Sequence, residues 1–209
     1  MQAKNSFPLI EDIQDFDAVI LANGNFPRAV EPLRLLRLAP FVCACDGAAG
    51  KYPEADVLVG DGDSVPEALH SRLIQIDEQE DNDLTKATRY CLSKGMKRIV
   101  YLGATGLRED HTLGNISLIV RYALQMDVEP LMATDYGWFV VANGYSEFQS
   151  FPHQQVSIFN IDCKFLETEG LKWNGYPFQQ LWQGTLNETT DECFKLKTDG
   201  NCLIYRTYK

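Results

Sequence analysis

The sequence predicts two structural parts: an N-terminal, mostly parallel α/β sheet domain over residues 1–135 and a C-terminal antiparallel β-sandwich over residues 136–209. Through about the first 130 residues, short apolar runs alternate with helical patterns, which is typical of a parallel sheet covered by helices on both faces. After about Asp135 the pattern changes to short alternating runs separated by turn residues, with no helical pattern. A chain of 209 residues is long enough for two such cores.

Each strand of the first part is predicted from a short apolar run. These runs are Ala18–Ala22, Phe41–Cys45, Asp56–Gly60, Leu73–Ile76, Arg98–Leu102 and Pro130–Ala133, and we expect all of them to be buried. Helices are predicted between them at Glu31–Leu38, Glu67–Arg72, Asp83–Lys94 and Asp110–Met126. In the last helix an apolar stripe at helical spacing is expected to face the core, formed by Leu113, Ile116, Val120 and Leu124.

The second part is predicted to contain short antiparallel strands. The alternating runs are Trp138–Ala142, Glu147–Phe151, Gln155–Asn160, Phe194–Thr198 and Leu203–Tyr208. Three dipeptides are typical of tight hairpin turns: Asn143-Gly144, Asn174-Gly175 and Asp199-Gly200.

Charge and cysteine usage exclude several classes of function. Nineteen basic and 29 acidic residues give a net charge of −10, which argues against an extended nucleic-acid-binding face. No apolar stretch approaches the roughly 18 residues expected of a membrane span, and no signal-type segment is found at the N-terminus. The six cysteines contain no CxxC pair, so they are interpreted as packing thiols. We therefore expect a cytoplasmic protein with neither a nucleic-acid nor a membrane partner.

Polar, glycine-rich segments follow four of the predicted strands. They are Asp46–Gly50 (DGAAG), Gly60–Ser64 (GDGDS), an acidic run that ends in Asp81–Lys86 (DNDLTK), and Gly103–His111 (GATGLREDH). Because ligands of parallel α/β sheets bind beyond the carboxyl ends of the strands, these segments predict a ligand site at one sheet edge.

The carboxylates of these segments indicate a Mg²⁺ site. Asp61 and Asp63 are separated by one glycine in a tight turn, where their mutual repulsion favours a cation between them. Asp46 and Asp83 arrive from neighbouring strands and are expected to join them. The alternative is a turn whose aspartates and Ser64 cap the following helix.

Asp83, Thr85 and Lys86 open a predicted helix. Asp83 and Lys86 are three residues apart and share a helix face, so one can contact the metal and the other a phosphate, while Thr85 adds a hydroxyl. The alternative is an ordinary helix-start charge pattern with a solvated lysine. The preceding acids, Asp77 to Asp81, are expected to form a solvated loop.

The loop that begins at Gly103 has features of an anion-binding segment, although it matches neither a Walker A motif nor a Rossmann fingerprint. Gly103 and Gly106 allow backbone N–H groups to approach an anion just before a helix N-terminus. Arg108 offers a bidentate fork for phosphate. His111 and Asn115 share a helix face and are expected to make polar contacts near a nucleotide.

Taken together, these motifs resemble those of the thiamine pyrophosphokinase family. The matching segments are Cys45-Asp46-Gly47, Gly60–Ser64, Asp83-Leu84-Thr85-Lys86-Ala87, Gly103–Asn115 and, in the second part, Gly170-Leu171-Lys172-Trp173. One departure is Gly184-Thr185-Leu186-Asn187, where the family usually ends its motif with Ser-Asn. The resemblance spans roughly residues 18–205.

The resemblance implies an N-terminal α/β domain, a C-terminal β-sandwich and a homodimer with thiamine near the subunit interface. The implied reaction converts ATP and thiamine to AMP and thiamine diphosphate. By motif match, Asp46, Asp61, Asp63 and Asp83 form the catalytic Mg²⁺–polyphosphate site. Thr85, Lys86, Arg108, Asp110, His111 and Asn115 complete the nucleotide pocket. Trp173, Thr185 and Asn187 are the candidates for thiamine contacts.

The implied mechanism is attack of the thiamine hydroxyl on the β-phosphorus of ATP, with Asp46 or Asp61 as the proton acceptor. Two other functions fit the carboxylate pattern: a DxD-type nucleotidyl or nucleotide-sugar transferase, and a module that senses a nucleotide without turning it over. A haloacid-dehalogenase-like phosphatase is disfavoured, because Asp61-Gly62-Asp63-Ser64 does not match the turn that follows its nucleophile.

Overall fold

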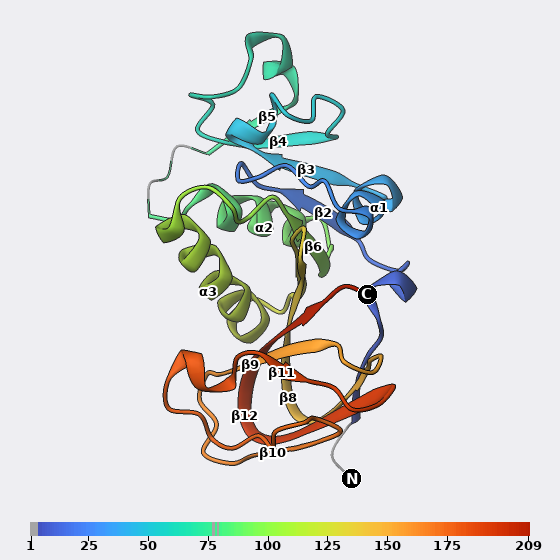
Figure 1. Ribbon diagram of the computed structural model, residues 1–209. Coiled ribbons are helices and arrows are strands. Elements are labelled where there is room, and N and C mark those ends of the chain that lie inside the picture. Colours follow the sequence, from blue (N-terminus) through green and yellow to red (C-terminus); the bar gives the residue numbers. More distant parts are fainter. Residues whose placement is uncertain (1–3, 77, 79) are drawn as a thin grey trace. The chain divides into compact units, whose positions relative to one another are not determined.

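The computed structural model describes residues 4–76, 78 and 80–209, which form a mixed α/β fold (Figure 1). The chain divides into two compact units: residues 14–135 form one, and residues 4–13 together with 136–209 form the other. In the described part of the chain, no helix is both long enough and apolar enough to cross a membrane.

The first unit is built on a parallel sheet with the strand order β7-β6-β2-β3-β4-β5. Its strands are β2 (Ala18–Leu21), β3 (Val42–Cys45), β4 (Val57–Gly60), β5 (Leu73–Gln75), β6 (Arg98–Leu102) and β7 (Glu129–Ala133). Its helices are α1 (Val30–Leu38), α2 (Asp83–Ser93) and α3 (Glu109–Gln125), with short 3-10 turns η2 (Asp46–Ala48) and η3 (Glu67–Arg72).

The central strands of this sheet are apolar throughout because helices cover both of its faces. Figure 1 shows α2 and α3 together on one face of the sheet and α1 on the other. Right-handed crossovers require this arrangement: the chain moves from β2 to β3 in one direction and from β6 to β7 in the opposite direction.

The strand order reverses between β2 and β6. From β2 the chain adds β3, β4 and β5 on one side, and then returns to place β6 against the other edge of β2. The loops that leave β2 and β6 therefore diverge, and a crevice opens between them at the carboxyl ends of the strands. Such a switch point is the usual ligand site of an open parallel sheet.

The second unit is built on two long antiparallel strands, β8 and β12, that pair along most of their length. Its strands are β1 (Lys4–Phe7), β8 (Gly137–Gln149), β9 (Gln155–Asn160), β10 (Leu166–Glu169), β11 (Asn187–Glu188) and β12 (Cys193–Thr207), with 3-10 turns η1 (Ile10–Asp12) and η4 (Leu181–Gly184). Both β9 and β10 pair with β12, β11 pairs with β9, and β1 pairs in parallel with β8. Residues 4–13 thus belong with this unit and not with the α/β unit, where we expected them.

Two predicted hairpins are wrong. Asn143-Gly144 lies inside the continuous strand β8, and Asp199-Gly200 lies inside β12. The two dipeptides face each other across the ladder, where the register shifts between Lys197 and Asn201. The left-handed conformation of Gly144 (φ +60°) therefore serves an irregularity in a paired strand and not a chain reversal. Asn174-Gly175 lies in a loop outside any hairpin.

The apolar stripe predicted for α3 is wrong at its two ends, whereas its middle residues Ile116 and Val120 are half-buried. Leu113 is 66% exposed and Leu124 is 42% exposed, whereas Ile119 and Tyr122 are fully buried. The helix carries two overlapping apolar stripes, and the buried one includes Tyr122, whose ring stacks on Tyr101 and whose hydroxyl finds a buried partner. The buried face of α3 therefore includes a hydrogen-bonding tyrosine, which a search for apolar residues at helical spacing does not detect.

Three smaller expectations for the first unit also differ from the structure. Glu67–Arg72 forms a 3-10 helix with no buried residue, and β5 is a half-exposed edge strand. The acids expected in a solvated loop are paired: Glu78 and Asp81 contact Arg89 at 2.5 and 3.1 Å. Asp77 lies outside the described residues.

Candidate active site

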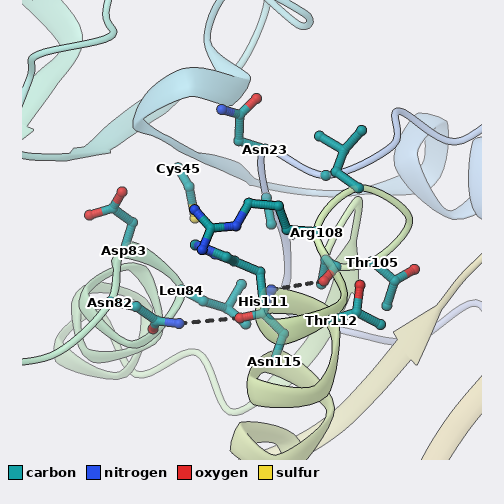
Figure 2. Close-up of a pocket in the computed structure, with 14 residues that line it drawn as sticks. Asn23, Cys45, Asn82, Asp83, Leu84, Thr105, Arg108, His111, Thr112 and Asn115 are labelled. Atoms are coloured by element: carbon teal, nitrogen blue, oxygen red, sulfur yellow. Dashed lines mark hydrogen bonds between the residues drawn. The ribbon is translucent and has the colours of Figure 1, made fainter.

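A pocket of about 410 Å³ lies at the switch point of the parallel sheet (Figure 2). Four parts of the first unit line it: the loop after β2, the end of β3, the start of α2, and the loop after β6 with the first turns of α3. The lining residues are Ala22, Asn23, Gly24, Cys45, Asn82, Asp83, Leu84, Ala104, Thr105, Leu107, Arg108, His111, Thr112 and Asn115.

The loops that follow β2 and β6 touch through their backbones at this point. The N–H of Gly24 donates to the carbonyl of Gly103 at 2.6 Å, and that of Asn25 donates to the carbonyl of Thr105 at 2.8 Å. A Cβ on Gly24 would overlap both carbonyl oxygens. Gly103 and Gly106 adopt left-handed conformations, with φ of +64° and +93°. Glycine is thus required at these positions to shape the pocket.

A pair of asparagines connects the loop after β6 to the start of α2. Asn82 caps α2 by accepting from the backbone N–H of Thr85 at 3.0 Å, and its amide donates to Asn115 Oδ1 at 3.2 Å. The Asn115 amide in turn donates to the carbonyl of Ala104 at 2.8 Å. Both asparagines therefore fix the pocket wall. Figure 2 shows the bonds from Asn82 to Asn115 and from Asn115 to Ala104 as dashed lines.

Arg108 and His111 point into the pocket from the start of α3 (Figure 2). The Arg108 guanidinium also holds the carboxylate of Asp110, with its Nε 3.1 Å and its Nη2 2.5 Å from the two oxygens. This contact raises the pKa of Arg108 and lowers that of Asp110. Asp110 thus orients Arg108 and is not itself part of the lining.

Asp46, Asp61 and Asp83 form a cluster of carboxylates beside the pocket. Asp46 is only 5% exposed, and its Cβ packs so close to Gly60 that a Cβ there would lie 2.5 Å away. Burial raises the pKa of Asp46, and the Asp61 and Asp83 carboxylates add to the rise, while a hydrogen bond from Ser64 N opposes it. Asp46 Oδ1 is buried, and no residue with a described position hydrogen-bonds to it.

This cluster fits a hard cation. The three crowded carboxylates lack positive charge, as the raised pKa of Asp46 and its orphaned oxygen indicate. Mg²⁺ needs only one or two carboxylates when phosphate oxygens supply other ligands. Within the described ranges, however, no three His, Cys, Asp or Glu side chains form a ready-made metal site. Asp63 is exposed and donates its backbone N–H to Asp61 Oδ1 at 3.2 Å.

Two residues predicted to contact the ligand lie behind the pocket wall. Thr85 is 1% exposed, and its hydroxyl bonds Tyr122 OH at 2.7 Å and Asn82 Oδ1 at 3.0 Å. Lys86 is 3% exposed, with its ammonium 3.4 Å from Asp83 Oδ1. Neither lines the pocket, although Lys86 can neutralise part of the charge of Asp83.

Sequence reasoning missed the loop after β2 and Cys45. Asn23 and Gly24 follow the first predicted strand, so the rule that selected the other strand ends would have selected them too. Cys45, at the end of β3, lines the pocket floor as a neutral thiol because burial raises its pKa.

A second pocket, of about 270 Å³, lies in the other unit. Its lining brings together the three residues predicted for the acceptor: Trp173, Thr185 and Asn187. Trp173 is 55% exposed, and the Lys172 ammonium lies 4.8 Å from its ring centroid. Asn187 holds the Trp173 backbone by donating to its carbonyl at 2.7 Å and accepting from its N–H at 3.2 Å.

The Thr185–Leu186 segment shows how the chain departs from the family motif. The Thr185 hydroxyl donates to the carbonyl of Trp182 at 2.7 Å. Leu186 has a left-handed backbone (φ +60°) and an exposed side chain that lines the second pocket. An apolar side chain therefore stands where the motif usually places a hydroxyl.

Two family models match the chain, one in each structural unit. Residues 33–129 match the model described as "Thiamin pyrophosphokinase, catalytic domain", and residues 137–205 match "Thiamin pyrophosphokinase, substrate-binding domain". The chain belongs to the thiamin pyrophosphokinase family. The reaction of this family, ATP-dependent transfer of a pyrophosphoryl group to thiamine to form thiamine diphosphate, is therefore the activity of this enzyme.

Solved structures of thiamin pyrophosphokinases share the fold. The enzyme from Candida albicans superposes with a TM-score of 0.76 at 15% identity, over 98% of this chain and 93% of that one. The yeast enzyme superposes with a TM-score of 0.76 at 15% identity, over 97% of this chain and 90% of the yeast chain. A family protein from Enterococcus faecalis superposes with a TM-score of 0.75 at 18% identity, over 92% of this chain and 99% of that one. A search of curated protein sequences found no match.

Because Thr85 lies behind the pocket wall, we predict that it contributes to protein stability and makes no direct contact with the ligand. Thr85→Val keeps the shape but removes the hydroxyl between Tyr122 and Asn82, so we expect a loss of about 1–2 kcal/mol in the free energy of unfolding. Because Thr85 does not line the pocket, the KM for ATP should change less than about threefold, a small effect in free energy. Urea unfolding and steady-state kinetics measure the two effects, with Thr85→Ser as the matched control. A large rise in KM with unchanged stability would contradict this assignment.

Proposed function

We propose that ATP binds in the pocket of residues 14–135 and thiamine in the pocket of the C-terminal unit, and that the enzyme acts with Mg²⁺ as a cytoplasmic homodimer. In this proposal the C-terminal unit is the family's β-sandwich. The observation that carries the assignment is the position of the carboxylate cluster. Asp83 lines the first pocket, and its charge reaches Asp46 beside Asp61. A polyphosphate in the pocket therefore meets a wall of acids that is suited to a bridging cation.

Asp46, Asp61 and Asp83 would hold the Mg²⁺ ion, and Asp63 would join them on the outer side of the turn. When bound, the ion neutralises the polyphosphate and makes the β-phosphorus more electrophilic. Arg108 and Lys86 offset the remaining charge, Arg108 from within the pocket and Lys86 from behind Asp83.

The backbone of the loops after β2 and β6 orients the nucleotide. Gly103 and Gly106 keep that backbone free of side chains, directly before the N-terminus of α3. Asn115 holds the loop through Ala104, and His111 adds a polar contact from the first turn of the helix. Positioning of this kind accounts for much of the rate of phosphoryl-type transfer, because the transition state is loose.

In the chemical step the thiamine hydroxyl oxygen forms a bond to the β-phosphorus, and the bond from that phosphorus to the bridging oxygen of AMP breaks. The hydroxyl proton passes to a carboxylate, Asp46 or Asp61.

Thiamine would be held against Trp173 in the second pocket. The exposed indole already attracts a cation, the Lys172 ammonium, and the thiazolium ring of thiamine is cationic. Asn187 sets the position of the indole through the backbone, and Thr185 lies at the pocket edge. Leu186 supplies an apolar contact.

Mass spectrometry of the products tests the function directly. Incubation with Mg²⁺, ATP and thiamine is expected to yield thiamine diphosphate and AMP in equal amounts. Thiamine monophosphate with ADP would indicate a simple kinase. An absence of turnover would indicate a nucleotide sensor, and nucleotide cleavage that does not depend on thiamine would indicate another transferase.

A further inference from the structure

A turn that begins at a proposed metal carboxylate is attached to the loop that lines the nucleotide pocket. We call residues 46–52 the connecting turn and residues 22–26 the β2 loop. The turn is closed by backbone bonds, from Ala49 N to Asp46 O at 3.1 Å and from Lys51 N to Ala48 O at 2.9 Å. Asp46 at its start and Lys51 near its end are thereby held in one rigid segment.

Three contacts join the connecting turn to the β2 loop. Gly47 packs closely against the amide group of Asn23, so a Cβ at this position would require the Asn23 side chain to move. The ring of Tyr52 stacks on Phe26 with centroids 6.3 Å apart. Between these two contacts, the Lys51 ammonium donates to the carbonyls of Asn23 and Gly24 at 2.9 and 2.8 Å.

The Lys51 contact differs from an ordinary surface ion pair. Lys51 is an exposed residue whose ammonium nevertheless makes two hydrogen bonds to the protein, and partial desolvation lowers its pKa. Among the residues with described positions, no carboxylate pairs with it, and both bonds go to backbone carbonyls of residues that line the pocket. Holding the ammonium at two carbonyls costs side-chain rotamer entropy, which the two hydrogen bonds must offset.

The geometry points to Lys51 as a positioning residue for nucleotide binding. By gripping both carbonyls it sets the position of Gly24, whose N–H bonds to Gly103 across the pocket, and it adds a positive charge at a pocket whose other wall carries acids. This inference rests on the proposed function, because it assumes that the pocket at the switch point holds the nucleotide.

The test measures binding of α,β-methylene-ATP, whose reactive bridge is not cleaved, by titration calorimetry in Mg²⁺. Lys51→Met keeps the aliphatic stem but removes the bonds and the charge, and we expect about tenfold weaker binding, the usual effect of losing hydrogen bonds to a charged group. Lys51→Arg, whose fork can reach both carbonyls, should bind within about threefold of the wild type. Lys94→Met is the control, because Lys94 contacts the Tyr90 ring at the end of α2 and does not line the pocket. Its binding should match that of the wild type.

Steady-state kinetics separates positioning from general damage. In Lys51→Met the KM for ATP should rise about tenfold while the KM for thiamine and the melting temperature stay unchanged. Binding by Lys51→Met within twofold of the wild type, or an equal rise in both KM values, would overturn the inference. If the wild type itself does not bind the nucleotide, the proposed function fails instead, and the two failures are distinguishable.

Discussion

Asp61→Asn is expected to lower kcat at least a hundredfold and to leave the enzyme folded. Asparagine keeps the size of the side chain but removes a charge from the group that neighbours Asp46. Loss of one carboxylate that positions a bridging cation raises the barrier by about 3 kcal/mol or more. Steady-state turnover at saturating Mg²⁺, ATP and thiamine measures the effect. Asp46→Asn should behave in the same way.

The same variant gives a second readout that does not depend on turnover. Burial is the main cause of the raised pKa of Asp46, and repulsion by the Asp61 and Asp83 carboxylates adds to it. Mg²⁺ should therefore raise the melting temperature of the wild type, and this shift should be lost in Asp61→Asn. The metal-free variant should be at least as stable as the metal-free wild type, because one repulsive charge is gone.

Glu54→Gln is the matched control, because Glu54 is an exposed acid in the same stretch of chain. It should keep both turnover and the shift in melting temperature with Mg²⁺. Near-normal turnover of both Asp61→Asn and Asp46→Asn would remove the basis for the metal assignment.

Gly24→Ala is expected to have the second large effect. The new methyl group would overlap the carbonyl oxygens of Gly103 and Thr105, which are backbone atoms that a rotamer change cannot move. The loops after β2 and β6 would have to separate and lose their two backbone hydrogen bonds. We expect about 2–4 kcal/mol lower stability and more than tenfold weaker nucleotide binding.

Gly114→Ala is the natural control for this substitution. Gly114 lies within α3, and a Cβ there meets no atom within 4 Å. The same chemical change should therefore stabilise the protein by about 0.5–1 kcal/mol, because alanine favours the helix. Chemical denaturation of the two variants should give shifts of opposite sign. Equal behaviour of the two variants would show that the contact between the loops does not hold the pocket.

The elements of the first unit could be predicted from sequence because its strands are buried on both faces and read as apolar runs. The strands β3 and β6 and the helix α2 match the expected segments within about one residue at each end. The long strands β8 and β12 could not be predicted as continuous. A glycine at a register shift carries the same sequence signal as a glycine in a hairpin, and only the paired strand distinguishes them.

Part of the candidate site could also be predicted. The rule that parallel strands deliver their carboxyl ends to one edge selected Asp46, Asp61, Asp83 and Arg108. Asp83 and Arg108 line the pocket at the switch point, and Asp46 and Asp61 lie near Asp83 without lining it. The rule gives no side-chain direction, so it could not place Thr85 and Lys86 behind the wall. The strand order, and with it the partnership of Gly24 and Gly103, depends on a pairing between β2 and β6 that no local pattern encodes.

The reversal of strand order has a consequence for how the enzyme is made. During synthesis β2, β3 and β4 emerge well before β6. The pocket therefore cannot form until β6 has been synthesised and has paired with β2. In the proposed function a nucleotide binds only after β6 has joined the free edge of β2, because segments on both sides of this pairing line the pocket. Cellular ATP would thereby protect the mature unit against unfolding and proteolysis while giving no help to the incomplete chain.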